Sequence, residues 1–429
     1  MKGLFDRLAP LAVIAVFLLM LLSIARISVF GDVEPEKHIY FEIVFLLLLA
    51  VAGELAVIYL RLPSVMVLML LGILMSHSFL ALGWGFLQSL DLPFALPAQP
   101  PEILRSESVI SVFAQLGAVI LLFKVGLHNK IEAIFATDNL VVAASGVALP
   151  FIAGFLYASM TGGNFAYSMF LGAALTATSV GVTVALLREF GLMEKRFAQI
   201  IIGAAVIDDV LGLLVLSFVI NLSSGAGSLA PLATTAVSAL VFLSGSVLVG
   251  NYFISYLDRK DMDPMRFLLV LAFMLSYAYI AEFIKLSAIV GAFIAGVMLN
   301  RSRHIAEIEE KTYGLEMLFM PIFFISLGML VDVGALAAYA VPIIIITAIA
   351  FITKAAACSA ASLWAKLDMR DSLLVGVGMA PRGEVALIVA SIGLTTSVLN
   401  ASQYSIISAM ALLTTFLAPP VLGYLLKRK

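Results

Sequence analysis

The sequence predicts an all-α protein that crosses a membrane many times. Of its 429 residues, 62% are hydrophobic and only 12% are charged, against about 25% charged residues in an average soluble domain. Apolar segments recur along the chain, each close to the ~20 residues that span the bilayer core as a helix. Lipid offers no partners to a bare backbone, and the segments lack the alternation of barrel strands. Helices are therefore expected throughout.

The first 30 residues allow two interpretations. Two basic residues, Lys2 and Arg7, precede an apolar run from Leu8 to Leu22. This pattern fits either a cleaved signal peptide or an extra transmembrane helix, since no convincing small-residue cleavage site follows. Both interpretations stay open.

The rest of the chain holds about thirteen apolar segments that are long enough to span, allowing for tilt. We expect them near residues 41–60, 63–82, 108–127, 138–159, 165–188, 197–221, 229–250, 265–283, 285–300, 315–334, 336–360, 371–395 and 402–425.

Basic residues in the connections predict the orientation. Most of them fall in connections on one side of the membrane, and the connections on the opposite side contain only Arg26, Lys37, Arg105 and Lys285. Basic residues mark the cytoplasmic side, so residues 31–40 face outward, the proline-containing connection 83–107 is external, and the C-terminus is cytoplasmic. This orientation needs an odd number of spans, which agrees with thirteen. The residues that gather on the predicted cytoplasmic side are Arg61, Lys130, Arg188, Lys195, Arg196, Arg259, Lys260, Arg266, Arg301, Arg303, Lys311, Lys366, Arg370, Lys427, Arg428 and Lys429.

An internal repeat connects the two halves of the sequence. The run that contains Gly126 resembles the run that contains Gly328, at an offset of 202 residues. The same offset places the polar segment 176–181 on the segment 378–383. Six predicted spans precede the 229–250 segment and six follow it. The single span at 229–250 carries the chain to the opposite side of the membrane, so the second set of six is inverted relative to the first, as in many secondary transporters.

Composition excludes several classes of function. The net charge of −2 argues against nucleic acid as a partner. There is one cysteine, Cys358, and the four histidines are scattered outside any metal-binding motif. We therefore expect no cofactor and no zinc or haem site built by the protein.

Two adjacent carboxylates, Asp208 and Asp209, lie in the middle of the 197–221 segment. A charged carboxylate at this depth costs at least ~2.5 kcal/mol, and like charges at close range resist joint ionisation. Neutral or purely structural carboxylates are the alternative. We favour a site that binds Na⁺ or a similar cation, and protons, through both residues.

Polar and helix-breaking residues interrupt two other segments. We expect them to produce discontinuous helices that meet beside the aspartates; kinked but continuous helices are the alternative. Half-helix ends and unwound carbonyls, with the Thr178 or Ser179 hydroxyl, would then complete an oxygen shell for a monovalent cation. The helix-breaking candidates are Thr176, Gly181, Gly378, Pro381 and Gly383.

Basic residues inside the spans need partners in lipid. We expect Lys354 to pair with Asp208 rather than to reach the interface. Arg382 would bind a carboxylate or free carbonyls, and Glu384 would offset the positive end of the second half-helix. Lys124, near the inner end of its span, is expected to extend to the interface.

Taken together, the Asp208-Asp209 pair, the Thr-Ala-Thr-Ser-Val-Gly run from Thr176, the Ile-Thr-Lys run ending at Lys354, and Gly-Met-Ala-Pro-Arg-Gly-Glu-Val from Gly378 resemble the bacterial sodium/proton antiporters. More narrowly they resemble the electrogenic Asp-Asp type in the second branch of the monovalent cation:proton antiporters. The resemblance covers about residues 41–425.

The resemblance implies a homodimer in the bacterial inner membrane that exchanges Na⁺, Li⁺ or K⁺ for H⁺ by an elevator-type movement. It implies that Asp209 binds Na⁺ or H⁺ and that Asp208 pairs with Lys354. It also implies a division into scaffold and dimerisation helices (41–127 and 265–334), core helices (138–221 and 336–425) and a linker helix (229–250).

Other functions remain as alternatives. A K⁺/H⁺ antiporter or a Kef-like K⁺ efflux protein is the nearest, although no nucleotide-binding domain of the Kef type precedes the end at Lys429. An intramembrane protease is disfavoured because adjacent aspartates on one helix point ~100° apart, so we expect no enzyme. A channel would conduct without strict coupling to protons.

Overall fold

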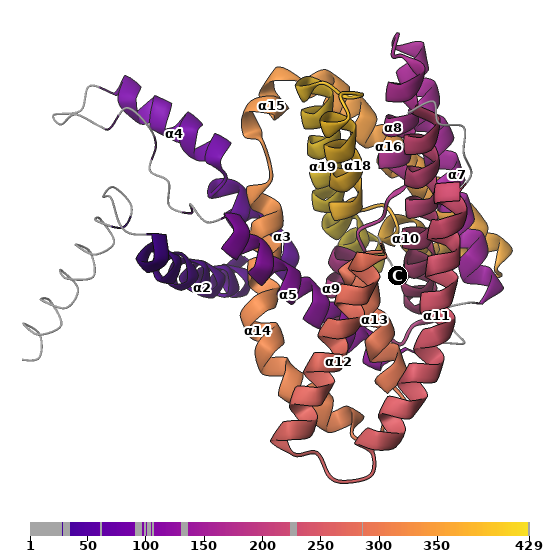
Figure 1. Cartoon of the computed structure of the whole chain (residues 1–429). Coiled ribbons are helices and arrows are strands. Elements are labelled where there is room, and N and C mark those ends of the chain that lie inside the picture. The colour runs from indigo at the N-terminus through magenta and orange to yellow at the C-terminus, as the bar shows by residue number, and fades with distance from the viewer. Residues whose placement is uncertain are drawn as a thin grey trace, which may run out of the picture.

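The computed structural model describes residues 28, 35–60, 62–90, 97, 100, 104, 107–129, 136–223, 230–284 and 286–427. Within this part of the chain every long regular element is a helix, which confirms the all-α prediction (Figure 1). Apart from Ser28, the predicted N-terminal segment 1–30 lies outside the described residues.

The first half of the chain forms nine of the described helices. Their order begins with a long helix, continues with a bent pair, and includes one helix pair that is interrupted in mid-span. They are α2 (Pro35–Leu60), α3 (Ser64–Leu74), α4 (His77–Ser89), α5 (Glu107–Leu127), α7 (Thr137–Met160), α8 (Phe165–Thr176), α9 (Val180–Glu189), α10 (Arg196–Ser223) and α11 (Ala230–Leu257).

The second half contains a similar succession and a second interrupted pair. Its helices are α12 (Pro264–Phe283), α13 (Ala288–Leu299), α14 (Ile305–Met329), α15 (Val333–Ala338), α16 (Ala340–Trp364), α17 (Met369–Gly378), α18 (Glu384–Thr395) and α19 (Ala401–Lys427).

The helices confirm a protein that crosses the membrane several times. Among the described residues, ten helical segments are long and apolar enough to span, or eleven if the α3–α4 pair, bent by 53°, is one span. Every predicted segment contains a helix or a helix pair, but α13 and α18 are short, so thirteen spans stays a prediction.

Two segments differ from the sequence prediction. Helix α14 begins at Ile305, ten residues before the predicted residue 315. The prediction counted only its apolar second half and left out the charged first half, which includes Glu307 and Lys311. The predicted span 63–82 bends near Ser76, whose hydroxyl accepts a hydrogen bond from Phe79 N and so begins α4. Helix α4 then continues to Ser89, into the stretch expected to be a connection.

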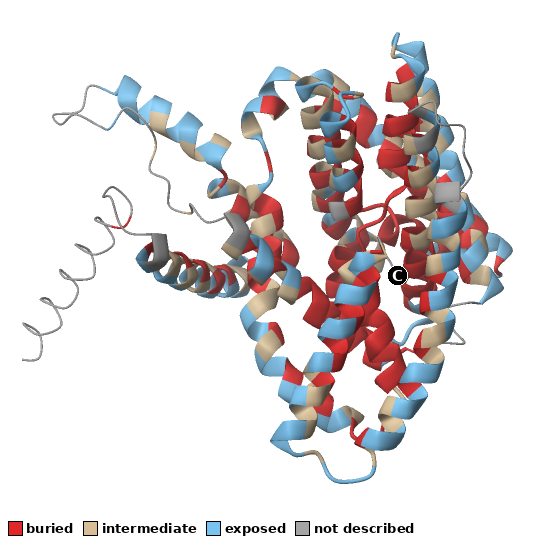
Figure 2. Ribbon diagram, in the orientation of Figure 1, coloured by how far each residue is buried: buried red, intermediate tan, exposed pale blue. Residues whose placement is uncertain are grey.

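The helices pack in two groups. One group contains α2, α3, α5, α12, α13 and α14, and the other contains α7, α8, α10, α16, α17, α18 and α19; contacts are dense within each group and sparse between them. Figure 2 shows the buried residues concentrated in the middle of the molecule, whereas α4, at the left, has none. Within the apolar stretch Phe165–Glu189, residues 167–187 are all buried, which places the first interrupted pair in the interior.

Glycine pairs bring helices of the first group into backbone contact. A Cβ on Gly72 of α3 or on Gly328 of α14 would collide with a backbone carbonyl of the other helix. The same reciprocal contact joins Gly126 of α5 to Gly296 of α13. Small residues allow this close approach between membrane helices. Gly126 and Gly328, the two residues that the sequence repeat aligned, each take part in one of these contacts.

Candidate functional site

Both predicted helix interruptions are present. Helix α8 ends at Thr176 and α9 begins at Val180. Helix α17 ends at Gly378 and α18 begins at Glu384. Gly181 and Gly378 lie within helices at the edges of the breaks, whereas Pro381 and Gly383 lie in the second break itself.

The two unwound segments cross and bond to each other. Ser179 N donates a hydrogen bond to Pro381 O at 2.8 Å, and Thr178 Oγ1 donates to Met379 O at 3.3 Å. At the edge of the crossing, Thr183 Oγ1 donates to Gly378 O at 2.6 Å. Backbone N–H and C=O groups that lack hydrogen bonds within a helix are thus hydrogen-bonded to the other break, since buried polar groups need such partners.

Glycine at the crossing is needed for space. A Cβ on Gly383 would lie 2.6 Å from Ser179 Oγ, well inside van der Waals contact. A side chain at position 383 would therefore push the two unwound segments apart. The predicted helix-breaking residues thus include one that also permits the close crossing.

The predicted pair of Lys354 and Asp208 is present. Lys354 of α16 is fully buried, and its Nζ lies 2.7 Å from Asp208 Oδ1 on α10. The same Nζ donates to Thr176 O, the last residue of α8, at 2.6 Å. Gly146 of α7 leaves room for the lysine, because a Cβ there would lie 3.1 Å from Lys354 Cε. The side chain therefore does not extend to the interface.

Asp208 and Asp209 are both buried on α10. Asp208 Oδ2 has no hydrogen-bond partner within the described protein atoms, although a buried carboxylate oxygen normally has one. Consecutive helical residues diverge by ~100°, so Asp209 presents its carboxylate in a different direction. Asp208 thus has one oxygen paired with lysine and another, Oδ2, without a hydrogen-bond partner among the described residues.

Arg382 binds carbonyls rather than a carboxylate. Its buried guanidinium donates from Nη1 to Ala177 O at 2.8 Å and from Nη2 to Ala350 O at 3.0 Å. The consecutive carbonyls of Thr176 and Ala177, at the negative end of the α8 dipole, therefore each bind a basic side chain. Each of these two carbonyls thus accepts one hydrogen bond from a basic side chain, and the contribution of unwound carbonyls to a cation site stays a prediction. The side chain of Glu384 lies outside the described set, so its role stays a prediction.

A second buried ionic cluster was not foreseen. Lys124 of α5 is buried, and its Nζ lies 2.6 Å from Glu316 Oε2 on α14, so the expected extension to the interface is wrong. Arg188 of α9 pairs with the other oxygen, Glu316 Oε1. Neighbouring Glu189 accepts from Ser64 N at 3.0 Å and from Ser64 Oγ at 2.7 Å, on α3. The end of α9 is thus attached to α3 and α14, two helices of the first group. The sequence contained one sign of this cluster, because Glu316 is a carboxylate in an otherwise apolar run and so needs a basic partner.

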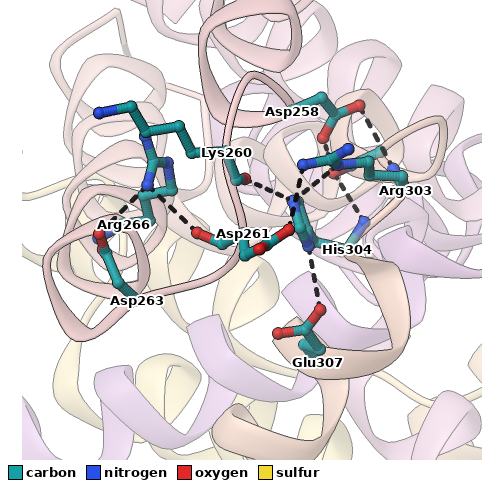
Figure 3. Close-up of polar contacts among 9 residues, drawn as sticks. Asp258, Lys260, Asp261, Asp263, Arg266, Arg303, His304 and Glu307 are labelled. Carbon is teal, nitrogen blue, oxygen red and sulfur yellow. Dashed lines mark hydrogen bonds and ion pairs between the residues drawn. The ribbon is translucent and has the colours of Figure 1, made fainter.

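The connections predicted to be cytoplasmic are also joined by polar contacts (Figure 3). Asp258 accepts from Ser302 Oγ at 2.7 Å and from Arg303 N at 3.3 Å. The two ring nitrogens of His304 lie 3.0 Å from Glu307 Oε1 and 3.0 Å from Lys260 O. The α11–α12 connection is therefore bonded to the start of α14. Lys260 and Arg303, two of the basic residues that predicted the cytoplasmic side, both lie in this cluster.

Comparisons with known proteins agree with this geometry. Residues 43–428 match the model of the transmembrane sodium/hydrogen exchanger family. The chain is 30% identical over 400 residues to the Na(+)/H(+)-K(+) antiporter GerN of Bacillus cereus, covering 91% of this chain and 96% of GerN. It is 34% identical over 341 residues to the high-affinity Na(+)/H(+) antiporter NhaS3 of Synechocystis, covering 76% and 73% of the two chains.

The fold also has a solved counterpart. The structure of the sodium proton antiporter MjNhaP1 from Methanocaldococcus jannaschii at pH 8 matches with a TM-score of 0.60 at 18% identity, covering 90% of this chain and 98% of that chain. The family match, the level of identity over most of the chain and the buried aspartate–lysine site between crossed helix breaks lead to one conclusion. The chain belongs to the sodium/hydrogen exchanger family and is a monovalent cation:proton antiporter of the membrane.

Proposed function

We propose that the protein exchanges Na⁺ for H⁺ across the bacterial inner membrane, with its C-terminus in the cytoplasm. The observation that carries this proposal is the buried Lys354–Asp208 pair beside the crossed breaks, with Asp208 Oδ2 left without a protein partner. Carboxylate and hydroxyl oxygens suit a hard cation. Asp209, Asp208 Oδ2 and the Thr178 or Ser179 hydroxyl would supply them.

Charge balance explains the coupling. When the cation leaves, Asp209 takes a proton and Lys354, protonated, neutralises Asp208. When the cation returns to the two carboxylates, Asp209 loses its proton, the Lys354–Asp208 pair weakens and the lysine, without its partner, releases a proton as well. Two protons then exchange for one Na⁺, and the cycle moves one net charge.

Alternating access would come from a movement of one helix group against the other. The group that contains α10, α16, α8 and the second interrupted pair carries the site, and its contacts with the group around α5 and α14 are sparse. This packing supports the proposed division into core helices (138–221 and 336–425) and scaffold helices (41–127 and 265–334). A homodimer formed through scaffold helices completes the proposal, by resemblance to the family.

The shared role of Asp209 is tested by Asp209→Asn in reconstituted vesicles. The amide cannot exchange a proton, so coupled Na⁺ flux should disappear while folding survives, since a neutral amide is easier to bury than a charge. Asp138→Asn is the matched control, because Asp138 forms a half-exposed pair with Arg196 at 3.2 Å, outside the site. Proton-coupled Na⁺ flux that persists in Asp209→Asn would exclude this role.

A K⁺/H⁺ exchanger or a Kef-like K⁺ efflux protein is the second candidate. GerN, whose name includes both Na⁺ and K⁺, favours keeping it. The same vesicles, with K⁺ in place of Na⁺, separate the two. Proton movement driven by K⁺ but not by Na⁺ would make K⁺ the substrate.

A further inference from the structure

Helix α19 holds the middle of the second break through two adjacent threonines. Arg382 N donates to Thr414 Oγ1 at 3.1 Å, and Thr415 Oγ1 donates to Arg382 O. Both threonines are buried. Arg382 lies between α17 and α18, where its backbone has no helical partners, so these hydroxyls satisfy its N–H and its carbonyl.

The two hydroxyls act in opposite senses. Thr414 Oγ1 donates its own hydrogen to Ala411 O at 2.8 Å, which leaves a lone pair for the Arg382 N–H. Thr415 Oγ1 directs its one hydrogen toward the Arg382 carbonyl and shares it with Ala411 O, which lies 3.0 Å away. A hydroxyl can accept and donate, whereas valine, of nearly the same shape, can do neither. The clamp therefore depends on hydroxyl chemistry and not only on packing.

The clamped peptide controls two further sets of contacts. On one side, the carbonyl of the preceding residue, Pro381, accepts from Ser179 N and so fixes the crossing of the breaks. On the other, the Arg382 guanidinium binds Ala177 O and Ala350 O. Ala350 lies one helical turn before Lys354 on α16, and Ala177 follows the residue whose carbonyl binds Lys354. A shift of the Arg382 peptide would therefore reach both unwound segments.

We propose that Thr414 and Thr415 are positioning residues for cation exchange. They hold the Arg382 peptide so that the first break, with Thr178 and Ser179, keeps its place beside the aspartates. They act through Arg382 and do not touch the cation. This inference rests on the proposed exchange function, because its effect is expressed in cation binding.

The test compares Thr414→Val and Thr415→Val with Thr414→Ser and Thr415→Ser in reconstituted vesicles. Each valine leaves one buried backbone group without a partner, so the KM for Na⁺ should rise about tenfold. Each serine keeps the hydroxyl and should keep the KM of the unmodified protein. Thr312→Val is the matched control, because Thr312 is equally buried but bonds only within its own helix, to Ile308 O and Glu309 O.

A role in folding alone gives a different result. It would lower the maximal rate through loss of active protein and leave the KM unchanged, and that outcome overturns the proposal. A KM that rises equally in Thr312→Val overturns it as well.

A second measurement needs no variant and no transport. Hydrogen exchange of the unmodified protein should show the Arg382 amide protected to the level of the α17 amides, although it lies outside any helix. Rapid exchange at Arg382 overturns the clamp even if the valine variants fail to accumulate. If the unmodified protein exchanges no Na⁺ for H⁺ while the Arg382 amide is protected, the proposed function fails and the clamp itself stands.

Discussion

The membrane potential should drive Na⁺ out of the cell through the charge carried by Lys354. Lys354 and Asp208 form a fully buried pair, so a proton gained or lost by Lys354 changes the charge of the site inside a low-dielectric interior. If two protons exchange for one Na⁺, each cycle moves one charge, worth ~2.3 kcal/mol per 100 mV. Because ~1.4 kcal/mol corresponds to a factor of ten, 100 mV should sustain a Na⁺ gradient of about 45-fold at equal pH on both sides.

The assay uses right-side-out vesicles with an imposed inside-negative potential and no pH gradient. Na⁺ efflux should accelerate with potential and approach that gradient. Lys354→Gln removes the group that carries the second proton and leaves Asp208 without its positively charged partner. Either the voltage dependence or transport itself should therefore disappear. Lys195→Gln, in the exposed α9–α10 connection, should behave like the unmodified protein. Efflux that ignores voltage in the unmodified protein would refute the reasoning and indicate one-for-one exchange.

The remaining predictions concern stability and topology. Glu316→Gln leaves Lys124 and Arg188 facing each other without a carboxylate, which should destabilise the fold by about 3 kcal/mol, the low end for a buried pair because Arg188 is partly exposed; an unchanged thermal unfolding midpoint in detergent would contradict this. Cysteine introduced at exposed Ala306 should react with an impermeant thiol reagent only from the cytoplasmic side, and cysteine at exposed Thr396 only from outside. The reverse labelling pattern would overturn the orientation.

Local chemistry made much of the site predictable. Thr178, Ser179, Pro381 and Gly383 interrupt apolar runs where a continuous helix would leave them unexplained, and both breaks are present. A lysine and an aspartate at bilayer depth require each other, and the pair of Lys354 and Asp208 follows from that requirement.

Contacts that depend on how distant helices pack were not predictable. Lys124 could reach the interface from its place in the sequence, and only the packing of α5, α9 and α14 shows that Glu316 lies beside it. Likewise, no local pattern distinguished a carboxylate from carbonyls as the partner of Arg382, because the choice depends on which helix ends surround the second break. The start of α14 was predicted too late for a simpler reason. Spans were identified by their apolar length, and the first half of this helix is charged.

The glycine contacts between α3 and α14 and between α5 and α13 set a limit on sequence variation. Where backbone meets backbone, no change of rotamer can make room for even one methyl group, so in a saturation mutagenesis screen these positions should tolerate glycine alone. Other glycines have open space around the missing Cβ, and there alanine should be accepted or even favoured, because it restricts the unfolded chain. The intolerant positions are Gly72, Gly126, Gly296 and Gly328, and the permissive ones are Gly83, Gly85, Gly314 and Gly423.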